Sequence, residues 1–369
     1  MKDKKPFDFL LFIIVLMLLS LGLIMVFSAS APIAEKKYND IYFFIKKQLR
    51  FAVLGMVLMM VAANYDYHKY GRKIAIALMG FSILLLVLVL VPGIGVEING
   101  SRRWIYVSSF QFQPSELAKL AIIIFYSYFL SKRKKPLDSF FRDLLPYLFV
   151  IGIISLLLLR EPHLSATIIM LSLAMIILFA AGAKIRHFMA LAAPVCAGLA
   201  AVIMFTDYMT LRINSFIHPW SYPKDEGWQT IQSLYAIGSG GLFGRGLGQS
   251  LQKFLYVSEP HNDYIFAILA EELGFVGVMT VLLLYLVFIW RGIKIAVHAP
   301  DTYGSLLATG ITALIAVQSL FNVAVVTNTV PPTGVSLPFF SSGGTSLVLF
   351  MFEVGILLNI SRYSKYERI

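Results

Sequence analysis

The sequence predicts an all-α integral membrane protein with ten transmembrane helices, and three observations carry this prediction. Of the 369 residues, 58% are hydrophobic and only 14% are charged, and the mean hydropathy of +0.78 is far above that of a soluble domain. The apolar residues gather in runs long enough to cross the roughly 30 Å of hydrocarbon in a bilayer. These runs do not alternate between polar and apolar residues, as the strands of a membrane barrel do.

Each predicted span is a mostly apolar run that a helix could use to cross the bilayer. The ten spans are residues 9–29, 48–63, 74–91, 115–130, 144–159, 164–181, 188–205, 264–290, 303–326 and 345–360. Lysines precede the first span, as in a secretory signal peptide, but its apolar run exceeds the about 7–15 residues of such a segment. We therefore expect a retained anchor and a single membrane domain, 1–369.

The positions of lysine and arginine predict the orientation of the chain. An even number of spans places both termini on one side of the membrane, and basic loops favour the cytoplasm. The run Lys132-Arg133-Lys134-Lys135 is the clearest cytoplasmic anchor. With both termini inside, the longest polar segment, 206–263, becomes a large extracellular loop between the seventh and eighth spans. We expect short interfacial or re-entrant helices in it, because it is far longer than an ordinary connector.

The net charge of +11 is partly explained by cytoplasmic anchoring. The remaining basic residues are predicted to face outward, where they suit anionic lipid headgroups or a pyrophosphate. They include Arg102, Arg103, Arg245 and Lys253. Nucleic acid is not an expected partner, because the sequence has no basic domain outside the membrane. Cys196 is the single cysteine, so the chain forms no internal disulfide framework.

A glycine-rich, basic segment at 238–248 leads through Asp263 into an apolar helix. The glycines lack the spacing of the known nucleotide-binding motifs, which leaves either a phosphate cradle or a closely packed loop. Asp263 has two open roles, as an ordinary helix N-cap or as a catalytic group. A carboxylate where an outer loop meets the bilayer suits a substrate with a polar head and a lipid tail. Glu259 and His261 lie close by in the sequence.

Two further segments carry polar residues at predicted membrane depth. Glu116 and Lys119 are three residues apart, so they share one face of a helix and can pair. Such a pair is either a structural lock between helices or part of a polar cavity. The segment 331–346, rich in proline, glycine and serine, interrupts the chain before the last span. Irregular backbone at this depth must line a cavity or be buried in protein, and it could equally be a re-entrant loop of a transporter.

These segments resemble the SEDS family (shape, elongation, division and sporulation), and within it the FtsW/SpoVE branch. The resemblance covers nearly the whole chain. Its specific blocks are 99–105 (NGSRRWI), 113–120 (QPSELAKL), 233–249, 259–274 (EPHNDYIFAILAEELG) and 332–346 (PTGVSLPFFSSGGTS).

The resemblance implies a peptidoglycan glycosyltransferase that polymerises lipid II at the outer face of the bacterial cytoplasmic membrane. The family's functional aspartate falls on Asp263, as general base, and its charged pair falls on Glu116 and Lys119. The expected partner is a class B penicillin-binding protein, and the role is in division, sporulation or cell shape. A divalent cation, Mg²⁺ or Mn²⁺, is a candidate cofactor. The candidate substrate-binding residues are Glu116, Lys119, Arg102, Arg103, Arg245, Lys253, His261, Ser341 and Gly343.

The chain departs from the family pattern at three places. The usual His-Thr-Asp-Phe reads His261-Asn262-Asp263-Tyr264, and Ser-Tyr-Gly-Gly reads Ser341-Ser342-Gly343-Gly344. A Gln-Pro-Asp-Leu-Gly block reads Glu161-Pro162-His163-Leu164-Ser165, which puts a histidine in place of a carboxylate. Two alternatives to the enzyme stay open: a lipid II flippase, which is a transporter, and a non-catalytic membrane scaffold.

Overall fold

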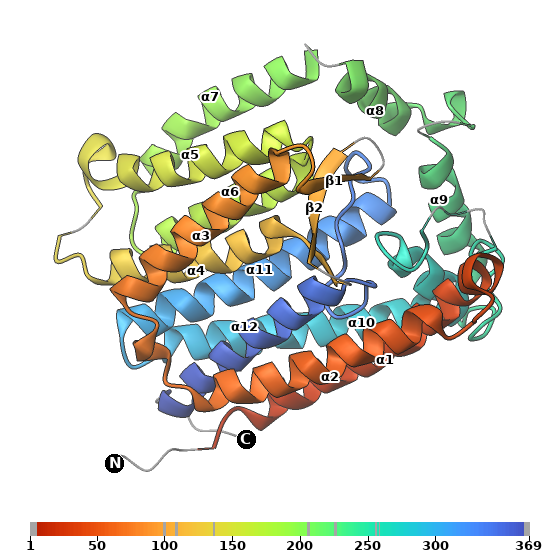
Figure 1. Ribbon diagram of the computed structural model, residues 1–369, viewed down its shortest axis with the longest axis horizontal. Helices are drawn as coiled ribbons and strands as arrows, with labels where there is room; N and C mark the ends of the chain where they lie inside the picture. The colour runs from red at the N-terminus through yellow and green to blue at the C-terminus, as the bar shows by residue number, and fades with distance from the viewer. Residues whose placement is uncertain are drawn as a thin grey trace.

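The computed structural model describes residues 6–98, 101–107, 110–135, 137–204, 207–224, 227–254, 257 and 259–364, and it is dominated by long helices (Figure 1). The helices in chain order are α1 Phe9–Tyr38, α2 Phe43–Asn64, η1 Tyr67–Lys69, α3 Arg72–Leu90, α4 Pro114–Ser131, η2 Phe140–Leu144, α5 Leu145–Arg160, α6 Leu164–Ala180, α7 Ile185–Met204, α8 Asp207–Ile217, η3 Pro219–Ser221, α9 Trp228–Gly240, α10 Ile265–Val297, α11 Thr302–Val326 and α12 Gly344–Tyr363.

Each of the ten predicted spans coincides with one of these helices over most of its length. In the described part of the chain, six helical segments have both the length and the apolar composition to cross a membrane: α1, α3, η2 with α5, α10, α11 and α12. Large apolar side chains on them and on α2 are exposed, for example Val53 (59%) and Leu283 (59%), as expected of surfaces that face lipid. A helical membrane protein is therefore confirmed, and the count of ten spans stays a prediction.

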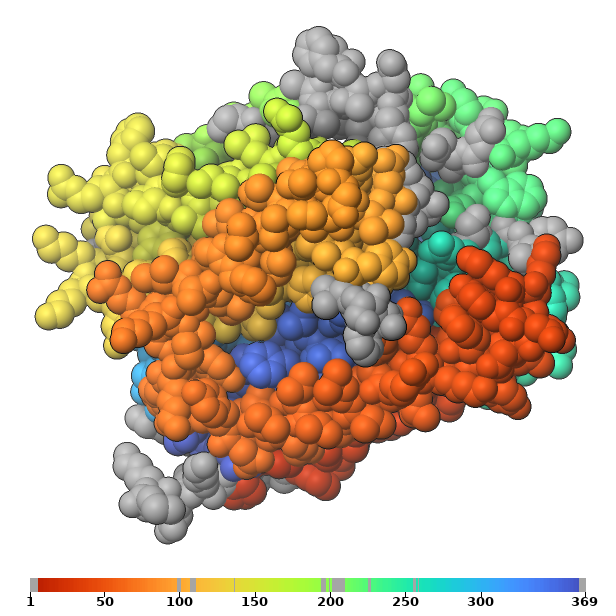
Figure 2. Space-filling view, in the orientation of Figure 1, coloured from red at the N-terminus to blue at the C-terminus, as the bar shows by residue number. Residues whose placement is uncertain are grey.

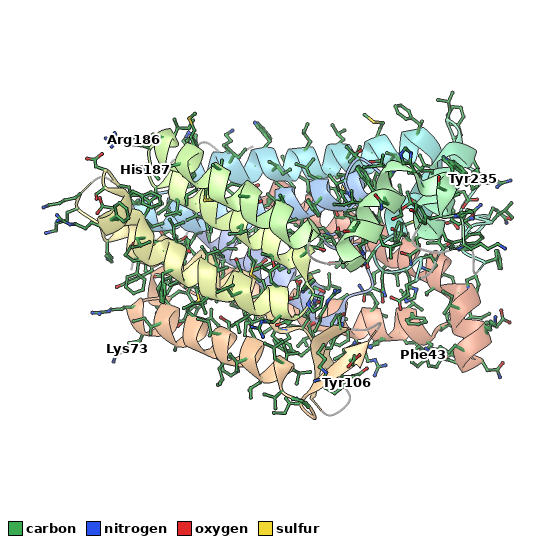
Figure 3. All side chains as sticks on the ribbon, turned by 90° about the horizontal axis from the view of Figure 1, so that it is seen from above. Phe43, Lys73, Tyr106, Arg186, His187 and Tyr235 are labelled. Carbon is green, nitrogen blue, oxygen red and sulfur yellow. The ribbon has the colours of Figure 1, made fainter. Side chains whose placement is uncertain are left out.

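The helices run between two ends of the molecule that differ in character. Figure 3 shows Lys73, Arg186 and His187 at one end and Phe43 and Tyr235 at the other. The beginning of α1 and the end of α12 both lie at the first end, where the Asp8 N–H donates to Ser361 Oγ (2.9 Å). This arrangement agrees with an even number of spans. Which end faces the cytoplasm stays a prediction from the basic loops.

A three-stranded antiparallel sheet lies between α3 and α4, which the expectation of a purely helical chain missed. Its strands are β1 Gly95–Ile98, β2 Ser101–Val107 and β3 Phe110–Phe112, in the order β1-β2-β3. The physical reason is visible in β2, whose Trp104, Ile105, Tyr106 and Val107 are strong strand formers. The sheet carries Arg102 and Arg103 on β2, where the pairing with β1 shifts at a bulge between Val96 and Glu97.

The long segment between α7 and α10 contains α8, η3 and α9, which confirms the expectation of short helices there. Its glycines pack closely against a break in α10 at Gly274, where φ is 65°. The Phe275 N–H donates to Gly241 O (2.9 Å) and the Arg245 N–H to Glu271 O (3.0 Å). A side chain at Gly244 would collide with the backbone of Glu272. Of the two readings of the glycines, the structure supports the closely packed loop.

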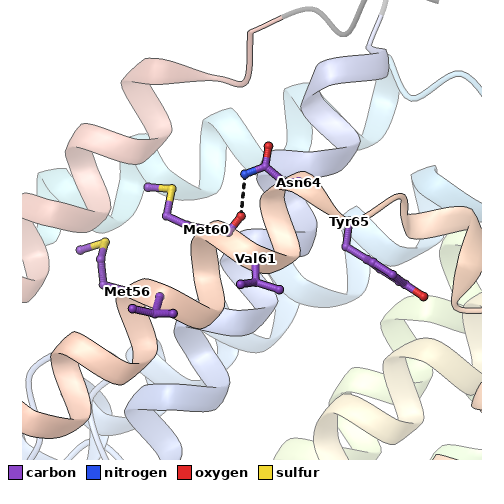
Figure 4. A pocket seen from close by; sticks show the side chains of 6 residues that line it. Met56, Met60, Val61, Asn64 and Tyr65 are labelled. Atoms are coloured by element: carbon purple, nitrogen blue, oxygen red, sulfur yellow. Dashed lines mark hydrogen bonds between the residues drawn. The ribbon is translucent and has the colours of Figure 1, made fainter. Parts of the chain in front are cut away.

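A cleft opens between α2 and α3 on one side of the molecule. Figure 2 shows α12, in blue, between these two helices, and α2 packs along α12 while α3 packs on α4. A separate apolar cavity of about 580 Å³ lies along α2, lined by Met56, Val57, Met60, Val61, Asn64 and Tyr65 (Figure 4). Phe44, near the start of α2, is about 18 Å along the helix from Met56, the lining residue nearest to it, at 1.5 Å per residue. This cavity therefore lies far from the polar site described next.

Candidate functional site

Two irregular segments meet at the candidate site: the turn 259–264 before α10 and the segment 331–343 before α12. The Ser342 N–H donates to His261 O (2.9 Å), and the Ser341 hydroxyl donates to Asn262 O (2.8 Å). The same hydroxyl accepts from the Leu337 N–H (2.7 Å). Ser341, predicted to bind substrate, thus joins the two segments and fixes the position of Asp263.

The backbone of Asp263 is also held from α11. The Asn322 side chain donates to Asp263 O (2.8 Å) and to Val335 O (2.6 Å), so one amide group positions both segments. The N-cap of α10 is Tyr264, and no side chain caps it. The interpretation of Asp263 as a helix cap is therefore wrong. Asp263 is partly exposed, and among the described residues none donates a hydrogen bond to its carboxylate.

The environment of Asp263 raises the pKa of its carboxyl group toward neutral pH. Burial and the nearby charge of Glu259 together raise the pKa of Asp263 to about 7, against the opposing charge of Arg103. A carboxyl group that is partly ionised at neutral pH is matched to general-base work. The neighbouring His261 is packed against Phe44, with ring centroids 4.3 Å apart, and burial lowers its pKa to about 4. His261 therefore stays neutral.

Glu116 and Lys119 form a buried ion pair, with Nζ and Oε1 2.7 Å apart. Lys119 Nζ also donates to Gln318 Oε1 (2.8 Å), and Gln318 Nε2 donates to Ser336 O (3.0 Å). The pair thus links α4 to α11 and to the segment that lies against Asp263. It acts as a structural lock, and it belongs to the same polar cluster as Asp263. The structure thus supports the structural lock, and contact of the pair with substrate stays a prediction.

The two arginines of β2 have different surroundings. Arg102 Nε lies 3.3 Å from Glu97 Oε2 in an exposed ion pair. Arg103 donates to the carbonyl oxygens of Glu161 (3.3 Å) and Pro162, in the turn between α5 and α6. The charge of Arg103 also acts on the pKa of Asp263, so Arg103 lies near the carboxylate, and contact of either arginine with substrate stays a prediction.

Arg245 and Lys253 lie in a second cluster. Arg245 Nη1 is 3.3 Å from Glu271 Oε1, and Lys253 Nζ is 2.8 Å from Glu272 Oε1 and 3.1 Å from Ser28 Oγ. The two glutamates follow Asp263 by about two turns of α10 and tie the glycine-rich loop to it. Both cations already have carboxylate partners, and their predicted contact with substrate stays a prediction.

Gly343 precedes α12 as its N-cap, and a side chain there would collide with Ser346 Oγ. Its predicted contact with substrate also stays a prediction. The described residues contain no group of three His, Cys, Asp or Glu side chains that could hold a metal ion. A divalent cation bound near Asp263 would therefore take most of its ligands from water and substrate phosphates, as Mg²⁺ often does. The cation therefore stays a prediction as well.

Residues that sequence reasoning did not assign to the site also belong to it. Asn322 and Gln318 were noticeable only as polar side chains within an apolar span. Glu161 and His163 were noticeable as a departure from a family pattern, and both side chains are buried. Fold and site together define a helical membrane protein whose irregular loops enclose a cluster of carboxyl groups and cations around Asp263.

The chain belongs to the FtsW/RodA/SpoVE family, whose model, described as a cell cycle protein, matches residues 9–366. Stage V sporulation protein E of Bacillus subtilis (strain 168) is 49% identical over 365 residues, 99% of both chains. A probable peptidoglycan glycosyltransferase FtsW of Geobacter sp. (strain M18) is 40% identical over 361 residues, 98% of both chains. The resemblance found in the sequence is thereby confirmed.

Solved structures share the fold. The rod shape determining protein RodA of Thermus thermophilus matches with a TM-score of 0.72 and 28% identity over 98% of both chains. A chain of a peptidoglycan synthase complex, studied for its coordination of polymerization and crosslinking, matches with a TM-score of 0.79 and 25% identity. That match covers 97% of this chain and 99% of the other.

Proposed function

We propose that this protein is a peptidoglycan glycosyltransferase that polymerises lipid II, a disaccharide-pentapeptide on undecaprenyl pyrophosphate, into glycan strands. The observation that carries the proposal is Asp263, a carboxyl group with a pKa of about 7 and an accessible surface, held between two irregular segments of a membrane protein. The names of the FtsW relatives support the same reaction class.

Asp263 acts as the general base. Its carboxylate takes the proton from the 4-hydroxyl of the acceptor sugar while that oxygen attacks the anomeric carbon of the donor. The bond from this carbon to the pyrophosphate breaks, and the pyrophosphate leaves on the lipid. One displacement with inversion turns the α-linked donor into a β-1,4 product, so one base is sufficient.

Cations stabilise the negative charge that builds on the departing pyrophosphate. Arg103 and Lys119 are the basic residues of the cluster around Asp263 and are the first candidates for this role. A divalent cation would supply further charge when bound between substrate phosphates.

The cleft between α2 and α3 offers a path for the polyprenyl chain. Phe44, which packs on His261 beside Asp263, lies on α2. A lipid tail in the cleft would run along α2 and α12 while its pyrophosphate and sugars reach the polar cluster. Ten spans with cytoplasmic termini would place this cluster at the outer face of the cytoplasmic membrane.

A class B penicillin-binding protein is the proposed partner, because the product of this reaction is the glycan strand that a transpeptidase crosslinks. The structural match to a chain of a peptidoglycan synthase complex supports such an assembly. The partner would act from the same side of the membrane as Asp263.

The test is polymer formation from purified lipid II, with and without the cognate penicillin-binding protein, followed by separation of the products by size. Wild type with its partner is expected to make long glycan. Asp263→Asn is expected to make none while it elutes as folded protein and binds the partner. Glu35→Gln, at an exposed glutamate of α1, is the control and is expected to match wild type.

Three outcomes contradict the proposal in different ways. Long glycan made by Asp263→Asn would exclude Asp263 as the general base. Transport of fluorescent lipid II across liposomes without any polymer indicates a flippase. Absence of both activities in the wild-type complex indicates a scaffold.

A further inference from the structure

Glu161, at the end of α5, carries a buried carboxyl group that makes no hydrogen bond to the residues the structure describes. The residue is 1% exposed, and neither Oε1 nor Oε2 has a hydrogen-bond partner among the described residues. A buried polar group that makes no hydrogen bond costs about 1–3 kcal/mol, and more if it is charged. Such a cost is expected to persist at a site that a ligand completes.

His163 shares this property two residues later. Its side chain is 6% exposed, and Nδ1 has no partner in the described part of the chain. The backbone of the turn is nevertheless firmly held. The N–H groups of Glu161 and His163 donate to Leu158 O, and Arg103 donates to the carbonyl oxygens of Glu161 and Pro162. The turn is fixed through its main chain, while the Glu161 carboxyl group and His163 Nδ1 make no hydrogen bond in the described part of the chain.

The turn belongs to the cluster around Asp263. The charge of Arg103 affects the pKa values of Glu161, His163 and Asp263, and the charge of Lys119 affects that of His163. Lys119 is joined through Gln318 to Ser336, two residues after the Gly334 that lies against the Asp263 carboxylate. The charge of Arg103 therefore acts on both the turn and Asp263, and Lys119 connects the turn electrostatically to the segment beside the Asp263 carboxylate.

The chemistry of the turn selects the kind of ligand. A metal cation is disfavoured, because the positive charge of Arg103 already acts on Glu161 and on His163, and that of Lys119 acts on His163. Burial raises the pKa of Glu161 to about 8 and lowers that of His163. At neutral pH both groups are then mostly uncharged, and each can donate one hydrogen bond and accept another. Neutral hydroxyl and amide groups match such partners.

We propose that Glu161 and His163 form a subsite that hydrogen-bonds the hydroxyl and acetamido groups of a sugar ring of the substrate beside Asp263. The proposal rests on the proposed function and deepens it. In this chain the carboxyl group lies at the first position of the turn and the imidazole at the third. Glu161 is then a substrate-positioning residue of the polymerase.

The experiment measures KM and kcat for lipid II in the wild-type complex with its partner and in two variants. Glu161→Met has a similar volume and makes no hydrogen bond, whereas Glu161→Gln keeps one donor and one acceptor group. We expect KM to rise roughly tenfold in Glu161→Met and to stay within about threefold of wild type in Glu161→Gln. The melting temperature of Glu161→Met is expected to equal or exceed that of wild type, because a costly buried group is gone.

An unchanged KM in Glu161→Met would contradict the proposed subsite. An equal rise of KM in Glu161→Met and Glu161→Gln would contradict it too, because the effect would then come from side-chain packing and not from hydrogen bonding. If Glu161→Met does not fold, His163→Leu, which makes no hydrogen bond, is compared with His163→Asn, which keeps donor and acceptor groups. The same two outcomes for KM would contradict the subsite. Failure of the proposed function is distinct, because wild type itself would then make no polymer. Binding of fluorescent lipid II in the Asp263→Asn background checks that the change in KM reflects affinity.

Discussion

Gly334 lies directly against the carboxylate of Asp263: a Cβ atom added at position 334 would come within 2.9 Å of Asp263 Oδ2. The segment before α12 therefore forms one wall of the site. Contact at this distance means that even a methyl group must displace the carboxylate or the loop. The position of the carboxylate thus depends on the absence of a side chain at residue 334.

Gly334→Ala is expected to lower kcat about tenfold, because a shift of the base by a few tenths of an ångström spoils its alignment with the acceptor hydroxyl. The melting temperature should change little, since residue 334 is exposed. Rates of polymer formation check this. Gly80→Ala on α3 is the control, because a Cβ there meets nothing within 4 Å. Wild-type kcat in Gly334→Ala would contradict the contact.

Asn322→Leu removes the donor that serves both Asp263 O and Val335 O. The buried Val335 carbonyl and the partly buried Asp263 carbonyl lose a partner, so we expect a loss of stability of about 2 kcal/mol together with a large loss of activity. Thermal unfolding in detergent and polymer formation measure the two effects. Asn64→Ala is the matched control, because Asn64 is exposed and its side chain donates to Met60 O of its own helix. A stable, fully active Asn322→Leu would exclude the positioning role.

Lys119→Met leaves Glu116 as a buried charge without its cation, and a loss of about 3–5 kcal/mol is expected. The double variant Glu116→Gln with Lys119→Met removes both charges and should recover most of that stability. We expect it to stay inactive, because Lys119 also contributes positive charge to the cluster. Unfolding curves and polymer assays of the single and double variants test this. Full activity of the stable double variant would make the pair purely structural.

The positions of the helices could be predicted from the sequence because lipid imposes long apolar runs, and each of the ten runs lies on a helix. The sheet β1–β3 could not be predicted, because its strands are short and its pairing depends on contacts across a hairpin. The break in α10 at Gly274 could not be predicted from the sequence for a similar reason. Its backbone hydrogen bonds go to the glycine-rich loop, some thirty residues earlier in the chain.

The catalytic candidate Asp263 and the pair Glu116 and Lys119 could be found from the sequence, since charged groups near apolar spans are costly and noticeable. The separation of the basic residues into two clusters could not be predicted from the sequence. Sequence alone placed Arg103, Arg245 and Lys253 on one outer surface, whereas the structure pairs the latter two with Glu271 and Glu272. Partners of this kind follow from tertiary packing and have no local signal.

The most direct measurement is the single-turnover rate of glycosyl transfer against pH, from about pH 5.5 to about pH 8.5, in wild type and in Asp263→Asn. Burial raises the pKa of Asp263 to about 7, and only its ionised form can accept a proton. The wild-type rate should therefore fall about tenfold per pH unit below 7 and level off above it. Asp263→Asn should be about 10²- to 10⁴-fold slower at the plateau, with no inflection near 7. A wild-type rate that ignores pH across this range, or the same inflection in Asp263→Asn, would contradict the account.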